Sequence, residues 1–192
     1  MKSKKNSDKI PRTGRVGRFA KIVEKETDSN TFIHIMKDSS EYSNFKPEET
    51  ALWWKGAIER LEKKLGKDKA IEIMETCGSK CCGAGQRKLA KKMMEESSSL
   101  EEFLEKLGSH RVKDGELTYI LADKNTIIAR HNRCFCGQVK QSKELFKNDI
   151  YCQCSVEFNK TFFEAALEQE VAVTLKSSIL NGDEYCEFEV KI

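Results

Sequence analysis

The chain has 192 residues, of which 39% are hydrophobic and 34% are charged, with a net charge of +3 and eight cysteines. This size and composition are typical of a globular domain, and no apolar run approaches the ~20 residues of a membrane-spanning helix. The basic N-terminus has no apolar segment after its charges, which argues against a secretory signal peptide. We therefore expect a cytoplasmic protein whose thiols are reduced.

The positive charge is concentrated in residues 1–18, which carry seven basic side chains against the single acidic residue Asp8. The rest of the chain has a net charge of −3. We expect a basic flexible tail over 1–18 and a single domain over 19–192, divided into a helical part (47–108) and a sheet-plus-helix part (109–192). Such a tail could bind nucleic acid or anionic lipid, but a solvated arm is favoured because it has no aromatic residue for base stacking. The rest of the chain has no basic excess, so nucleic acid is not an expected partner.

Residues 19–46 are compatible with either strands or short helices. A helix is then predicted from Pro47, which suits a first helical turn, to Gly66, which suits a helix end. Between them, apolar residues recur at steps of three and four: Trp54, Ile58, Leu61 and Leu65. Three further helices are predicted over about 67–77, where Gly78 would end the helix, over 86–94, and over about 99–107 behind a capping box.

The second half changes character. Residues 117–122 and 126–130 are short β-prone runs that predict a hairpin, and 155–167 predicts a helix with Phe158, Phe162 and Ala166 spaced by fours. Alternating strands over 171–175 and 186–192 flank the turn signal Asn181-Gly182. The expected fold class is α+β: a helical N-terminal half packed on an antiparallel sheet with a crossing helix.

The eight cysteines form three groups and one single residue: Cys77, Cys81 and Cys82; Cys134 and Cys136; Cys152 and Cys154; and Cys186. In an extended segment, residues two apart point to the same side, so each C-x-C pair could offer two sulfurs to one metal ion. Residues four apart share a helix face. These spacings predict a thiolate site for zinc, or for iron with a different geometry. The expected ligands are Cys77, Cys81, Cys134, Cys136, Cys152 and Cys154.

Other interpretations of these residues remain open. Paired thiols can be redox-active, and single buried cysteines such as Cys186 behave as small hydrophobic residues. His131 lies three residues before Cys134 and could add a nitrogen ligand, although this is the less favoured interpretation. Trp53 and Trp54 could line an apolar ligand pocket, but a core position is favoured for Trp54.

The C-terminal segments carry a family resemblance. Tyr151-Cys-Gln-Cys-Ser155 precedes an aromatic-rich helix, the strand and turn of residues 171–183, and Cys186-Glu-Phe188. This order resembles the end of the 4-vinyl reductase domain, clearly over 134–192 and more thinly over 70–133. It is more closely similar to uncharacterised bacterial and archaeal relatives that add C-G-x-x-C and two C-x-C motifs. Hydrolases of L-2-amino-thiazoline-4-carboxylic acid look like distant kin.

The resemblance implies a ligand cavity between sheet and helices, with a structural zinc beside it in the aromatic-sensing members. Cys152 (or Cys154) and Cys186 match the two outer zinc ligands of that pattern. The two middle ligands fall near Leu175 and Ser178, which cannot replace them. Any metal would therefore need ligands from Cys134, Cys136 or the Cys77–Cys82 group.

Together these features predict a cytoplasmic protein that binds a small, apolar or aromatic molecule beside a cysteine-bound metal. The alternative is an enzyme, either a hydrolase or a thiol-based catalyst. The sequence does not fix the oligomeric state, and a homodimer stays an open expectation.

Overall fold

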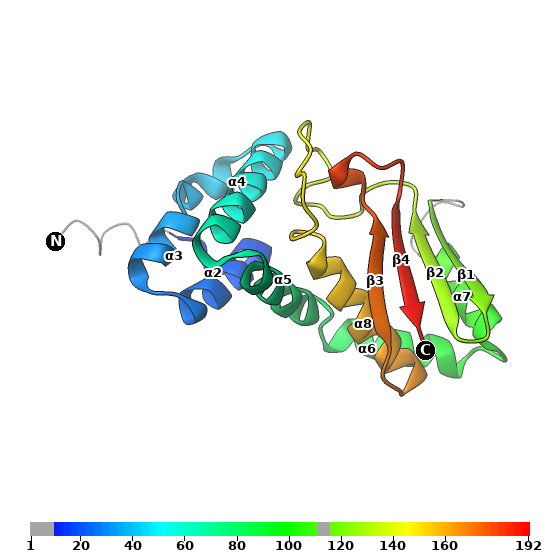
Figure 1. Cartoon of the computed structure of the whole chain (residues 1–192). Coiled ribbons are helices and arrows are strands. Elements are labelled where there is room, and N and C mark those ends of the chain that lie inside the picture. The colour runs from blue at the N-terminus through cyan, green and yellow to red at the C-terminus, as the bar shows by residue number, and fades with distance from the viewer. Residues whose placement is uncertain (1–9, 111–115) are drawn as a thin grey trace.

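The computed structural model describes residues 10–110 and 116–192, and shows the N-terminal helices on one side of the molecule and a sheet with further helices packed against it on the other (Figure 1). The described residues contain seven α-helices and a four-stranded antiparallel sheet, which confirms the predicted α+β class. Most helices precede the sheet. Only α8 (Gln153–Leu167) lies between strands, and it crosses between β2 and β3.

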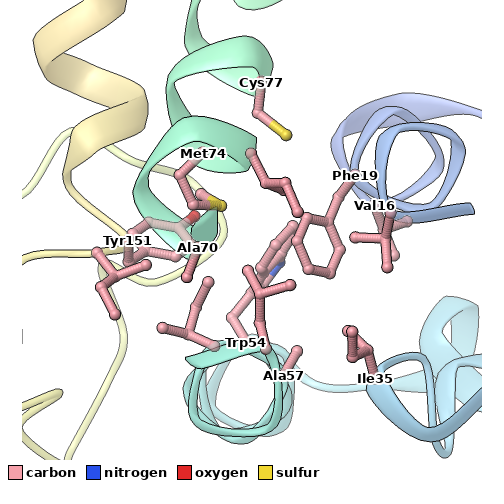
Figure 2. Close-up of a cluster of buried hydrophobic side chains, with 14 of the residues drawn as sticks. Val16, Phe19, Ile35, Trp54, Ala57, Ala70, Met74, Cys77 and Tyr151 are labelled. Carbon is pink, nitrogen blue, oxygen red and sulfur yellow. The ribbon is translucent and has the colours of Figure 1, made fainter. Parts of the chain in front are cut away.

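The helical part is built from α2 to α5, joined by a short 3-10 helix, η1 (Ser39–Asn44). All the regular elements within residues 19–46 are helices, so the interpretation of this segment as strands was wrong. The four helices are α2 (Gly14–Glu26), α3 (Ser29–Ile35), α4 (Pro47–Leu65) and α5 (Lys67–Cys81). In their shared core (Figure 2), Phe19 of α2 packs against Trp54 of α4 with ring centroids 5.0 Å apart, while Met74 and Cys77 point in from α5.

The sheet consists of β1 (Leu117–Asp123), β2 (Thr126–His131), β3 (Ala172–Ser177) and β4 (Cys186–Lys191), in the order β1-β2-β4-β3. Both predicted hairpins are confirmed. A second 3-10 helix, η2 (Ile179–Asn181), stands between β3 and β4. Helix α7 (Leu100–Ser109) packs on β1, and helix α8 packs on β3. Helix α6 (Ala84–Glu95) packs on α8.

The register of the sheet matters for the site. His131, the last residue of β2, pairs with Cys186, the first residue of β4. Both residues therefore lie at the end of the sheet from which residues 132–152 leave toward the helical part. That connection packs into the helical core through Val139, Phe146 and Ile150.

Helix α5 is longer than predicted, because Gly78 does not end it. The helix continues to Cys81, and Gly78 is buried. A Cβ placed on Gly78 would lie 2.3 Å from the backbone oxygen of Cys154 at the start of α8. Glycine is needed here for the close approach of two helices, whereas Gly66 ends α4 as expected with a positive φ of 81°.

Part of the expected basic tail belongs to the folded body. Helix α2 begins at Gly14 and buries Val16 and Phe19, so Arg15 and Arg18 are fixed on its other faces. Ile10 of the expected tail is also buried in the helical core, and residues 1–9 lie outside the described residues. Among the described helices, none is long and apolar enough to cross a membrane.

Candidate functional site

A cavity of about 270 Å³ lies where the helical part meets the open end of the sheet. Elements far apart in the sequence line it: α2, the end of α5, the inner face of β1, β2 and β4, residues 134–136, and the start of α8. Six of the eight cysteines line this cavity: Cys81, Cys134, Cys136, Cys152, Cys154 and Cys186. Its lining is therefore far richer in sulfur than an ordinary ligand pocket.

Two of these thiols form a pair. The thiols of Cys81, the last residue of α5, and Cys154, in the first turn of α8, line the same cavity and lie close enough to interact electrostatically. The close approach at Gly78 brings the two helices near enough for this interaction. Arg18 Nη2 donates a hydrogen bond to Cys81 Sγ at 3.2 Å.

This surrounding favours a negative charge on Cys81. The interaction with Cys154 lowers the pKa of the Cys81 thiol, and Arg18 and Arg15 lower it further, which outweighs the opposite effect of burial. The same interaction and burial raise the pKa of Cys154, so a negative charge on the pair is favoured at Cys81. A half-buried thiolate beside a guanidinium is the usual setting of a reactive cysteine.

The helix dipoles act in the other direction, because Cys81 lies at a helix C-terminus and Cys154 at a helix N-terminus. A dipole of this kind is worth about 0.3–1 kcal/mol near a helix end. A hydrogen bond to a charged group contributes about 1.5–3 kcal/mol. The contact with Arg18 therefore places the charge on Cys81.

A third thiol lies at the same end of the cavity. Arg15 Nη1 donates a hydrogen bond to Cys136 Sγ at 2.9 Å, and the hydroxyl of Tyr151 lies 3.0 Å from the same sulfur. Arg15 is also within electrostatic reach of Cys81 and Cys154. The guanidinium of Arg15 thus contacts one thiol, Cys136, and interacts electrostatically with two others, Cys81 and Cys154, from separate segments.

Two of the remaining cavity thiols, Cys152 and Cys186, lie around Ser178. Cys152 Sγ is 3.2 Å from Ser178 Oγ, and Cys186 Sγ accepts a hydrogen bond from the backbone N–H of Ile179 at 3.4 Å. Burial raises the pKa of Cys152 to about 12 and that of Cys134 to about 11, so these thiols are protonated. The outer two positions of the zinc pattern, Cys152 and Cys186, do come together, with Ser178 between them.

His131 lines the cavity beside this second group. Its Nε2 atom is buried without a hydrogen-bond partner, and its ring lies 5.3 Å from Phe188 and 5.4 Å from Phe135. Burial lowers the pKa of His131 to about 4, so the imidazole is neutral. It contributes a neutral nitrogen to the cavity wall.

Five of the six expected metal ligands line the cavity, and Cys77 does not. Cys77 is buried in the helical core, where burial raises its pKa to about 12. Cys152 and Cys154 are not in an extended segment, since Cys152 has helical dihedral angles and Cys154 lies within α8. Trp53 and Trp54 are core residues and lie outside the cavity.

The sulfur ligands suit a soft metal ion, but the side chains in the described residues are not arranged as a metal site. Within residues 10–110 and 116–192, no three His, Cys, Asp or Glu side chains are placed to hold a metal ion together. The metal site therefore stays a prediction.

Arg15 and Arg18 were not among the site residues expected from the sequence, because the run of basic residues over 1–18 was interpreted as a flexible tail. The signal that could have found them is the spacing of Val16, Phe19 and Val23, which marks one face of a helix. A charged residue on such a helix is held in a fixed position and can serve a site.

The chain belongs to DUF6144, a family of unknown function, whose family model matches residues 17–192. No curated protein matches the chain. The likeness to the 4-vinyl reductase domain, and with it the hydrolase alternative, stays a prediction.

Proposed function

We propose that this protein binds a small molecule in the cavity and reacts with it through a dithiol formed by Cys81 and Cys154. The observation that carries the proposal is that these two thiols line one cavity wall where α5 and α8 approach closely at Gly78, with Arg18 hydrogen-bonded to Cys81. The lowered pKa of Cys81 supports it, because the thiolate is the attacking form of cysteine.

The reaction that suits such a pair is thiol–disulfide exchange. The Cys81 thiolate attacks one sulfur of a small disulfide, a bond forms between them, and half of the substrate leaves as a thiolate. Cys154 passes its proton to that thiolate and attacks the Cys81 sulfur, which releases the second half as a thiolate. Two electrons pass from the dithiol to the substrate, and a Cys81–Cys154 disulfide remains for a small cellular thiol to reduce.

We propose that the protein works in a reducing compartment such as the cytoplasm. All eight cysteines are free in the structure, although six of them line one cavity. A dithiol that works by reversible oxidation needs a supply of reduced small thiols, which the cytoplasm provides.

The test is to locate the bond after the reduced protein reacts with a limiting amount of a small aromatic disulfide. Trypsin would release the cysteines of interest in peptides 81–87 and 148–160, and fragmentation distinguishes Cys81 from Cys82 and Cys154 from Cys152. We expect a Cys81–Cys154 bond. With Cys154→Ser, the reaction should stop at a mixed disulfide on Cys81.

Two results would overturn the dithiol: modification of Cys81 that never proceeds to a bond with Cys154, or a first attack by another cysteine. Cys82→Ser is the matched control, because Cys82 is adjacent in sequence but buried in the core of the sheet part, outside the cavity. This variant should behave as the wild type.

Metal binding is the second candidate, favoured by the three thiols around Arg15. Thiolates of Cys81, Cys136 and Cys154 would suit zinc, and two arginines would offset their negative charge. Protein purified under reducing conditions should then contain bound zinc or iron, which Cys136→Ser loses and Cys77→Ser retains. Metal-free wild-type protein would rule this candidate out.

A further inference from the structure

The charge of the cavity wall is unevenly distributed. Among the described residues that line it, Arg15 is the only one with a permanent charge. It lies at the end that holds Cys81, Cys136 and Cys154. Arg15 is exposed, and only one of its donors is used in the contact with Cys136, so it has donors left for a ligand.

The rest of the lining is neutral and largely aromatic. Tyr119, Phe158 and Phe188 contribute to it, together with Leu117 from the edge of the sheet. His131 adds no positive charge at neutral pH, because its imidazole is buried and neutral. A ligand that matches this lining therefore has one anionic group and an apolar body.

We propose that the substrate of the Cys81–Cys154 pair is a small disulfide that carries a carboxylate or a similar anion. Arg15 binds the anionic group, and the apolar body extends toward Tyr119, Phe158 and Phe188. This inference rests on the proposed function, since it names the substrate class for the same thiols. It assigns Arg15 to substrate selection.

Arg18 has a different place and serves as a natural comparison. It contacts Cys81 but does not line the cavity, so it acts on the thiol and not on a bound molecule. Loss of Arg18 should slow the reaction with every disulfide equally. Loss of Arg15 should instead change which disulfide reacts faster.

The experiment compares three disulfides: dithiobis(nitrobenzoate), which is aromatic and anionic; dithiodipyridine, which is aromatic and neutral; and cystamine, which is cationic. The rate at Cys81 is measured for each and divided by the rate of a free small thiol with the same reagent, which removes intrinsic reactivity. We expect the anionic reagent to be favoured over the neutral one by about tenfold, equivalent to about 1.4 kcal/mol. Cystamine should react most slowly.

Variants separate selection from a general effect on the thiolate. Arg15→Gln should abolish the preference, Arg15→Lys should keep part of it, and Arg18→Gln should slow all three reagents without changing their ratios. Lys25→Gln is the matched control, because it removes one exposed charge from the same helix far from the cavity wall. It should leave both rates and ratios unchanged.

The outcomes distinguish the two proposals. Rapid reaction of Cys81 with all three reagents and no preference would refute anion selection and leave the dithiol intact. An equal slowing of all reagents by Arg15→Gln would likewise refute selection, since Arg15 would then act only on the thiolate. No reaction at Cys81 with any reagent would overturn both proposals.

Discussion

Substitution of Gly78 by alanine tests the contact that brings the two thiols together. The added Cβ would lie 2.3 Å from the backbone oxygen of Cys154 and 3.0 Å from its carbonyl carbon. Carbon–oxygen contacts are tolerated from about 3.3 Å, so α5 and α8 would have to separate by roughly 1 Å. Neither contact is with a flexible side-chain end, so the strain cannot be relieved by a rotamer change.

Overpacking of this kind costs about 1–3 kcal/mol. For a chain of this size a loss of about 2 kcal/mol lowers the melting temperature by roughly 4–8 °C. The separation should also weaken the interaction between the Cys81 and Cys154 thiols, which is the largest cause of the lowered pKa of Cys81. Alkylation of Cys81 should therefore require a higher pH in Gly78→Ala than in the wild type.

Thermal unfolding and the pH dependence of Cys81 alkylation measure the two effects. Gly85→Ala is the matched control: it also adds a methyl group to a helical glycine, but nothing lies within 4 Å of the new Cβ. It should be neutral, or stabilising by up to about 1 kcal/mol. If Gly78→Ala melts like Gly85→Ala and leaves the alkylation profile unchanged, the close approach of α5 and α8 is refuted.

Two further predictions concern other parts of the site. Burial lowers the pKa of His131 from 6.5 to about 4, so the unfolded chain binds the extra proton between these pH values and stability falls as the pH is lowered through this window. The full effect is roughly 3 kcal/mol, and His131→Phe should remove most of it. The measurement is the unfolding free energy at pH 7, about half a unit above the window, and at pH 4, at its lower end; a difference between these values that His131→Phe leaves unchanged would contradict this. Tyr42 accepts a hydrogen bond from Trp54 Nε1 at 2.7 Å and donates one to Gln138 in the segment between β2 and α8. Tyr42→Phe should cost about 1–3 kcal/mol by denaturant unfolding, and additive losses in a double-mutant cycle with Trp54→Phe would show that the two side chains are not coupled.

The sequence was sufficient for most of the fold, because those elements depend on local signals. The apolar spacing after Pro47 and the cap at Ser99 are read within one or two helical turns, and both helices are confirmed. The alternation around Asn181-Gly182 likewise predicts its hairpin. Gly78 shows the limit, because it carries the same local signal as Gly66 but is required by a neighbour that lies far along the chain.

The site was predicted only in part, for the same reason. The spacing of the cysteines marked the right residue type, and five of the six expected ligands reach the cavity. Their partners could not be derived from spacing, since Cys81 meets Cys154 across two helices and Arg15 meets Cys136 across most of the chain. The C-x-C rule failed at Cys152 and Cys154 because it assumes a strand, and these residues begin α8.

The most direct test of the dithiol is the order in which the cysteines of the reduced, folded protein react with a limiting amount of iodoacetamide near neutral pH. Cys136 is the internal reference, because it is also half-buried in the cavity wall and contacted by an arginine. The structure predicts that Cys81 is alkylated first and that Arg18→Gln slows its reaction. Alkylation of Cys136 before Cys81, or equal labelling of the two, would contradict a thiolate at Cys81.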